Sequence, residues 1–184
     1  MKGPEVIETG RLLLRPPRRT DARDIFERYA NDPEVTHFLG WPRHETPADT
    51  AAFLDFSEQH WKQWPAGPYL VFGRSDGRLL GGTGLGFESP VRAATGYVLA
   101  RDAWGQGFAT EALAAMADLA KQLGVERLYA LCHKDHRASA HVLEKCGFRC
   151  EGVHRREAAF PNLASRAPAD ILMYAKSWTS GQAV

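Results

Sequence analysis

Gly105-Gln106-Gly107-Phe108-Ala109-Thr110-Glu111 lies between an apolar, strand-like run at Tyr97–Ala100 and a helix-like run that ends at Gly124. A glycine-rich turn that opens directly onto a helix leaves several backbone N–H groups unpaired and pointing outward. Together with the positive end of the helix dipole, these groups form a site for phosphate. The stretch therefore predicts a strand, a phosphate-binding turn and a helix in this order, and a phosphorylated cofactor at the turn.

The spacing of the glycines excludes the two common nucleotide-binding motifs. A P-loop needs Lys followed by Ser or Thr after its last glycine, whereas Gly107 is followed by Phe108 and Ala109. The dinucleotide fingerprint needs a glycine at its sixth position, which is Thr110 in this chain. The upstream run Gly81–Gly86 fails the same test. The phosphorylated partner must therefore be recognised through another kind of turn.

Composition is that of an ordinary globular protein, with 44% apolar and 24% charged residues among 184. We expect a single domain over residues 1–176 and a C-terminal tail over residues 177–184. The formal net charge of +1 predicts no nucleic-acid partner, and no apolar run approaches the roughly 20 residues that span a membrane. Three cysteines do not suggest a disulfide scaffold, and the N-terminus lacks the apolar segment of a signal peptide. A cytoplasmic location is the expectation.

Local patterns predict strands and helices that alternate along the chain, which indicates an α/β fold with a mixed sheet of about seven strands. Strands are predicted at Val6–Arg15, Tyr69–Phe72, Leu79–Phe87, Thr95–Ala100, Arg127–Cys132, Phe148–Gly152 and Asp170–Ala175. Helices are predicted at Asp21–Tyr29, Pro33–Leu39, Pro47–Trp61, Glu111–Gly124 and Ala138–Cys146.

Three motifs resemble the GNAT family of N-acetyltransferases, and within it the ribosomal-protein N-terminal acetyltransferases of the RimJ/RimL type. The first is Gly96–Leu99 followed by Trp104–Leu113, in which Gly107 and Ala109 match the second half of the family's loop. The others are Ala138–Phe148, and the N-terminal Ile7–Arg15 followed by Asp21 and Asp32–Val35. They follow the family's order and cover nearly the whole chain. Trp104 departs from the Gln or Arg that usually begins the loop.

The resemblance implies a mixed central sheet flanked by helices, with strands that splay apart at an acyl-CoA site. It implies acetyl-CoA as co-substrate, with its pyrophosphate on the turn and its pantetheine paired to the preceding strand. His136 replaces an Asn that often contacts the coenzyme, and its ring could donate equivalently. The residues implied to bind the cofactor are Tyr97, Val98, Leu99, Trp104, Gly105, Gln106, Gly107, Phe108, Ala109, Thr110, His136 and Ser139.

The implied reaction is direct attack of a primary amine, on a protein N-terminus or a small molecule, on the acetyl thioester in a ternary complex. Many family members supply a tyrosine acid where this chain has Leu143. The ribosomal-protein branch often uses a serine early in the same helix, and Ser139 matches it. A helix-terminus hydrogen bond is the alternative role for Ser139. Transfer of another acyl group, such as succinyl, and non-catalytic sensing of acyl-CoA remain alternative functions.

The residue that removes the proton from the amine is not identified by a motif. Glu157 is offset by two positions from a glutamate of the branch, and such a shift along a strand keeps the same face. Glu88, at the end of the glycine-rich strand, is the other candidate. Each is alternatively a solvated surface carboxylate, and water alone could carry the proton.

Aromatic residues are more numerous than a core of this size requires, and an aromatic pocket would suit a peptide N-terminus or a small amine. Phe38, Trp41, Tyr69 and Phe160 are the predicted substrate contacts, although any one of them could instead belong to the core. The resemblance also allows a homodimer.

Cysteines and histidines between Cys132 and His154 invite a comparison with zinc sites. The set comprises Cys132, His133, His136, Cys146, Cys150 and His154, and its intervals match no common zinc pattern. No metal is therefore predicted.

Overall fold

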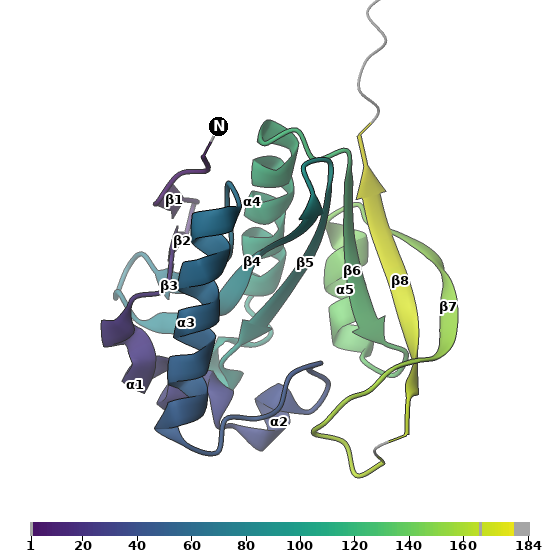
Figure 1. The fold of residues 1–184 in the computed structure, drawn as a ribbon, viewed down its shortest axis with the longest axis horizontal. Coiled ribbons are helices and arrows are strands. Elements are labelled where there is room, and N and C mark those ends of the chain that lie inside the picture. Colours follow the sequence, from purple (N-terminus) through teal and green to yellow (C-terminus); the bar gives the residue numbers. More distant parts are fainter. Residues whose placement is uncertain (1, 166, 179–184) are drawn as a thin grey trace, which may run out of the picture.

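An open mixed sheet of eight strands crosses the molecule in the order β1-β2-β3-β4-β5-β6-β8-β7 (Figure 1). The structure is a computed structural model that describes residues 2–165 and 167–178. The strands are β1 (Ile7–Glu8), β2 (Leu12–Arg15), β3 (Pro68–Gly73), β4 (Leu79–Ser89), β5 (Arg92–Leu99), β6 (Arg127–His133), β7 (Arg149–Ala158) and β8 (Ala169–Ser177). The predicted α/β fold with a mixed sheet is confirmed.

Helices pack against the sheet and enclose two apolar clusters. The helices are α1 (Ala22–Ile25), α2 (Pro33–Thr36), α3 (Pro47–Gln63), α4 (Phe108–Gln122) and α5 (Arg137–Lys145), with short turns η1 (Arg19–Asp21), η2 (Phe26–Ala30) and η3 (Arg101–Ala103). One cluster forms where Leu113 and Met116 of α4 meet the sheet, and the other contains Ile25 of α1 and Leu54 of α3. No described helix is long and apolar enough to cross a membrane.

The strand count differs from the prediction because the run Val6–Arg15 folds back on itself. Ile7 pairs with Leu14 across an antiparallel β1–β2 hairpin. The turn is closed by Thr9, whose N–H donates to the Leu12 carbonyl at 2.9 Å and whose side-chain oxygen accepts the Leu12 N–H at 3.0 Å. Apolar alternation alone does not reveal this interruption, because a threonine side chain that bonds its own backbone leaves no periodic signal.

The C-terminal strand extends to the end of the described chain. Strand β8 includes Ser177, and the N–H of Trp178 donates to the Glu126 carbonyl at 2.9 Å. The Trp178 side chain packs against the larger apolar cluster. Of the predicted tail, therefore, Ser177 belongs to the sheet and Trp178 contacts the core, while residues 179–184 lie outside the described residues.

Candidate functional site

Strands β5 and β6 are parallel and separate after a short stretch of pairing. They pair only at Arg92–Arg127, Ala93–Leu128 and Ala94–Tyr129. Beyond Ala94 the two strands diverge, as Figure 1 shows, although β5 continues to Leu99. The edge of β5 that faces the opening is left available to an extended ligand, because backbone N–H and C=O groups need partners. The predicted splay is confirmed.

The glycine turn follows β5 and opens onto α4. Gly105 and Gly107 have φ angles of 71° and 79°, in the left-handed region that glycine adopts without cost. A Cβ on Gly105 would meet no atom within 4 Å, so the requirement there is backbone conformation rather than space. The first N–H of the helix with a partner is that of Glu111, bonded to the Gly107 carbonyl at 3.1 Å.

The backbone N–H groups of residues 105–110 have no hydrogen-bond partner in the part of the chain that the structure describes. They lie at the N-terminus of a helix of four turns, where the dipole favours an anion. The turn therefore presents a row of unpaired donors at the end of the splay.

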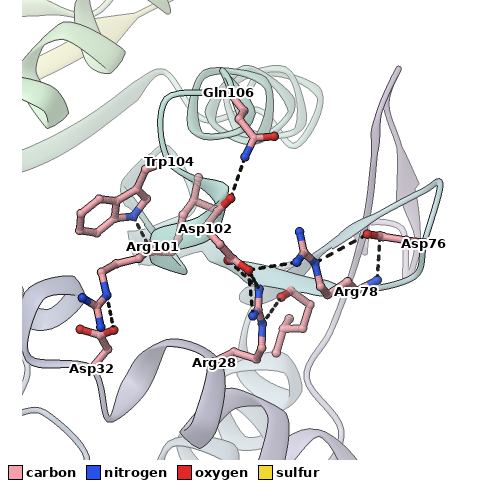
Figure 2. Close-up of polar contacts among 10 residues, drawn as sticks. Arg28, Asp32, Asp76, Arg78, Arg101, Asp102, Trp104 and Gln106 are labelled. Carbon is pink, nitrogen blue, oxygen red and sulfur yellow. Dashed lines mark hydrogen bonds and ion pairs between the residues drawn. The ribbon is translucent and has the colours of Figure 1, made fainter.

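Ion pairs and hydrogen bonds of neighbouring side chains hold the turn in place (Figure 2). The Asp102 carboxylate accepts hydrogen bonds from Arg28 at 2.8 Å and from Arg78 at 3.0 Å. The hydrogen bond from Arg28 lowers the pKa of Asp102 below its ordinary value. The Gln106 amide donates to the backbone carbonyl of Asp102 at 2.7 Å, which ties the turn to this cluster.

Three further side chains fix the ends of the turn. The Trp104 indole N–H donates to the Leu99 carbonyl at 2.7 Å, and Arg101 pairs with Asp32 at 2.7 Å (Figure 2). Arg11 donates to the Gln106 carbonyl at 2.8 Å. Side chains and carbonyls thus anchor the turn, while its N–H groups remain unpaired. Trp104, which was predicted as a cofactor contact, connects the turn to β5 through its hydrogen bond to Leu99.

A cavity of about 770 Å³ opens at the splay. All four predicted substrate contacts line it, namely Phe38, Trp41, Tyr69 and Phe160. The Tyr69 ring is 1% exposed and its hydroxyl donates to the Pro4 carbonyl at 2.7 Å, so it forms a wall and offers no free hydroxyl. The volume is within the usual range for sites that bind small molecules.

A pair of hydroxyl groups lies between the splay and the cavity. The Tyr97 hydroxyl of β5 is 2.9 Å from the Ser139 carbonyl and 3.0 Å from the Ser139 Oγ, in the first turn of α5. A phenol has one hydrogen, so when Tyr97 donates to the carbonyl it accepts the hydrogen of Ser139. Burial raises the pKa of Tyr97, which keeps the phenol neutral. Leu143 is buried in the core, as its apolar side chain requires.

The Tyr97 hydroxyl is a site group that the sequence did not indicate, because only its backbone was expected to act. The cross-strand position of Tyr97, opposite Thr83 of β4, aims the side chain at α5. No local pattern carries this information, since the partner lies in a different element.

Two histidines stack on Phe38 in the cavity wall. The ring centroids of His133 and His136 lie 4.8 Å and 4.9 Å from that of Phe38, and both rings stack on it. Burial lowers the pKa of both imidazoles, so both are neutral near pH 7. His133 Nδ1 accepts the Asp135 N–H at 3.2 Å, which assigns its proton to Nε2. The ring nitrogens of His136 have no hydrogen-bond partner among the described residues.

The two predicted bases do not line the cavity. Glu88 lies near the paired end of β5 and β6, where it bonds Arg92 at 2.6 Å and also accepts the Tyr129 hydroxyl. Glu157 is exposed on β7, whose register breaks between His154 and Ala158. The two-residue shift that kept Glu157 as a candidate assumed regular alternation. That assumption fails here, and Ala158 lines the cavity instead.

The cysteines and histidines near the cavity do not assemble into a metal centre in the described residues, where no group of three or more His, Cys, Asp or Glu could hold an ion. Cys132 and Cys146 are buried, and Cys150 is exposed and unpaired with another cysteine. The Cys132 thiol lies 3.3 Å from the His133 carbonyl. Cys132 and Cys146 act as small apolar side chains of the core.

This mixed sheet, with splayed parallel strands that lead to a turn of unpaired N–H groups, matches the fold that the resemblance to acetyltransferases implies. A family model described as the acetyltransferase (GNAT) domain matches residues 11–149. The chain belongs to this family of N-acetyltransferases.

Known proteins are similar over most of the chain. The uncharacterized N-acetyltransferase YoaA of Bacillus subtilis is 31% identical over 161 residues, which cover 82% of this chain and 86% of YoaA. The ribosomal L7/L12 α-N-protein acetyltransferase RimL superposes with a TM-score of 0.83 at 22% identity, over 95% of this chain and 94% of RimL. The microcin C7 self-immunity acetyltransferase MccE, solved with acetyl-CoA and AMP, superposes with a TM-score of 0.83 at 18% identity, over 95% and 97% of the two chains. Both solved structures share the fold of this chain.

Proposed function

We propose that this protein transfers an acetyl group from acetyl-CoA to a primary amine, with both substrates bound together. The observation that carries the proposal is the row of unpaired N–H groups at residues 105–110, located where the splay of β5 and β6 ends. Phosphate oxygens would satisfy these donors. The MccE structure with acetyl-CoA, which has the same fold, supports this donor.

In this proposal the pyrophosphate of acetyl-CoA lies on the turn and its pantetheine pairs with the free edge of Tyr97–Leu99. The chain of the donor would then lead toward the Ser139 hydroxyl, where β5 and α5 meet. His136 directly precedes α5, and its ring is available to contact the coenzyme or the amine. The acetyl thioester supplies the activated acyl group, and the residues of the chain orient it and manage the protons.

Ser139 is proposed to hydrogen-bond the sulfur that leaves as the new amide bond forms. An ordinary thiol has a pKa of about 8.5, so a nearby hydroxyl stabilises the developing thiolate and can supply its proton. Tyr97 acts as a positioning residue, because its hydroxyl contacts both the Oγ and the carbonyl of Ser139. This pair replaces the tyrosine that the family often places at the position of Leu143.

The proton of the attacking amine is proposed to leave through His136, directly or through a water. Its ring is neutral near pH 7, lines the cavity and has no partner among the described residues. A neutral imidazole within reach of an amine can act as a general base. This role passes to His136 because neither Glu88 nor Glu157 lines the cavity.

Acetyl-CoA affinity measured by calorimetry, together with thiol release over a panel of amines, tests this function. We expect micromolar or tighter affinity and turnover with at least one primary amine. Succinyl-CoA in the same assay tests the alternative acyl donor. Binding of acetyl-CoA without turnover on any amine would favour a sensor, and absence of binding would contradict the proposal.

A further inference from the structure

The charges that line the cavity restrict the acceptor. Asp49 is the only carboxylate among the described lining residues. Its Oδ2 accepts the N–H groups of Thr46 at 2.8 Å and Glu45 at 3.0 Å, together with the Thr46 hydroxyl at 3.1 Å. This carboxylate caps the start of α3 through Oδ2 and keeps its negative charge. A polycationic amine would therefore find one counter-charge among the described lining residues, at the start of α3.

A cation in the cavity wall does lack a partner. Arg43 lines the cavity, and within residues 2–165 and 167–178 its guanidinium makes no hydrogen bond or ion pair. By contrast, Arg28 and Arg101, outside the cavity, pair with Asp102 and Asp32 respectively. An unpaired guanidinium presents several donors that match a carboxylate or a phosphate.

Asn162 holds the loop that carries Arg43. The N–H of Arg43 donates to the Asn162 side-chain oxygen at 2.7 Å. The Asn162 amide nitrogen in turn donates to the carbonyls of Thr36 at 2.7 Å and Trp41 at 2.9 Å. One side chain between β7 and β8 thus fixes the backbone from Thr36 to Arg43, and the loop that carries the cation is positioned before a ligand arrives.

The rest of the wall is apolar and aromatic. Phe38 stacks with both His133 and His136, and Phe160 meets the His133 ring edge-on at 4.8 Å. Phe56 of α3 lines the rim and is 58% exposed. Aromatic walls of this kind favour a flat, apolar body over a hydrated one.

We propose that the acceptor is a monoamine that carries an aromatic or large apolar body and an acidic group, with the acidic group bound by Arg43. The inference rests on the proposed acetyl transfer and names the substrate class for the same site. An aromatic amino acid has this chemistry when free, and so does a peptide with an aromatic first residue and an acidic second one. The amine nitrogen bonds the acetyl carbon, the carbon–sulfur bond breaks, the amine loses a proton, and the coenzyme leaves as a thiol.

The test compares kcat/KM for L-tryptophan, tryptamine and spermidine at saturating acetyl-CoA, measured by thiol release. We expect L-tryptophan to exceed tryptamine by about tenfold or more, because a charge-assisted hydrogen bond is gained, and spermidine to be the poorest acceptor. Trp-Asp and Trp-Ala dipeptides distinguish the two sources of the acidic group. If Trp-Asp exceeds free tryptophan, a peptide N-terminus is the acceptor, and the reverse order assigns the free amino acid.

Arg43→Gln tests whether Arg43 recognises the acidic group of the acceptor and not its aromatic body. It should lower kcat/KM for L-tryptophan to the level of tryptamine and leave tryptamine within about twofold. Arg149→Gln, an exposed arginine of β7 that does not line the cavity, is the matched control and should change neither. Equal losses for both acceptors in Arg43→Gln would overturn the role of Arg43.

Two outcomes separate failure of this inference from failure of the proposed function. If spermidine or an aminoglycoside is the best acceptor, acetyl transfer stands and the inference is overturned. If no amine is acetylated, calorimetry with N-acetyl-L-tryptophan and coenzyme A shows whether the site still binds this class of ligand. Binding that is lost in Arg43→Gln would support the inference while contradicting turnover, and absence of binding would overturn both.

Discussion

The donor side and the acceptor side of the site are built by different kinds of interaction. The turn at residues 104–107 takes its shape from two glycines in left-handed conformation and from the start of α4 directly after them. The acceptor wall takes its shape from Asn162, which bonds carbonyls 126 and 121 positions earlier in the chain. Local conformation therefore shapes the donor turn, which distant side chains such as Arg11 and Arg28 then anchor, whereas the acceptor wall depends on long-range contacts for its shape.

The two sides also differ in their electrostatics. The donor turn is surrounded by paired charges, such as Asp102 with Arg28, so that only its backbone N–H groups remain free. The acceptor wall keeps a guanidinium, that of Arg43, without a partner among the described residues. A family that shares one donor and varies its acceptors would place its motifs on the first side, because a local motif persists while a wall assembled from distant segments changes.

The largest effect should come from Gly107→Glu. It places a side chain at φ 79°, where its Cβ would lie 3.3 Å from Arg11, and brings a negative charge to the pyrophosphate site. We expect loss of measurable acetyl-CoA binding in calorimetry. Gly77→Glu is the matched control, because Gly77 has φ 65° in the β3–β4 turn and shares the backbone strain of about 1 to 2 kcal/mol without facing the site. Unchanged affinity for acetyl-CoA in Gly107→Glu would show that the donor does not bind at the turn.

Ser139→Ala should have the next largest effect, on turnover rather than on binding. Loss of the hydroxyl that stabilises the leaving thiolate should lower kcat by about a hundredfold, with little change in the KM for acetyl-CoA. Tyr97→Phe should lower kcat less, and the double variant should be no slower than Ser139→Ala, because Tyr97 acts through Ser139. Wild-type kcat in Ser139→Ala would leave Ser139 with only a structural role, the hydrogen bond between its Oγ and the Tyr97 hydroxyl.

Asn162→Ala should disturb the acceptor side alone. It removes the hydrogen bonds to the backbones of Thr36, Trp41 and Arg43, and the loosened wall should raise the KM for the amine by about tenfold. Acetyl-CoA affinity of the same variant is the internal control and should not change. An equal loss of amine affinity and of acetyl-CoA affinity would show that the donor side and the acceptor side are not independent.

The smallest effect concerns pH. Burial, with the neighbouring His133 and His37, lowers the pKa of His136 below its ordinary value of 6.5, so the base remains neutral until the pH falls below that value. The pH profile of kcat/KM should therefore lose activity on the acid side with a midpoint below 6.5. His136→Gln should lower the plateau and remove this acid limb. If His136→Gln loses activity at acid pH in the same way as the wild type, another group is responsible for that loss.

Most of the helices and strands and the donor turn could be predicted from the sequence, because short sequence patterns determine them. The turn and the order of α4, β6 and α5 follow from patterns within a few residues of one another, whereas the splay of β5 and β6 was implied by the family resemblance. Val6–Arg15 was read as one strand because the Thr9 side chain closes a turn without disturbing the apolar alternation.

The acceptor side was predicted only in part. Aromatic residues such as Phe38 and Trp41 could be nominated from their number, and they do line the cavity. Asn162 had no signal, since an amide that bonds three distant backbone groups looks like any loop asparagine. Glu157 is exposed on β7, and the irregular register of this strand cannot be read from a period of two.

The central claim is that the N–H groups of residues 105–110 bind the phosphates of the donor, while the acceptor binds elsewhere in the site. Amide resonances of the ¹⁵N-labelled protein, followed during titrations with coenzyme A and with pantetheine, test it most directly. The account predicts large shifts for the amides of residues 105–110 with coenzyme A and none with pantetheine, which lacks the pyrophosphate. Equal shifts with both ligands, or no shift at these amides with coenzyme A, would contradict it.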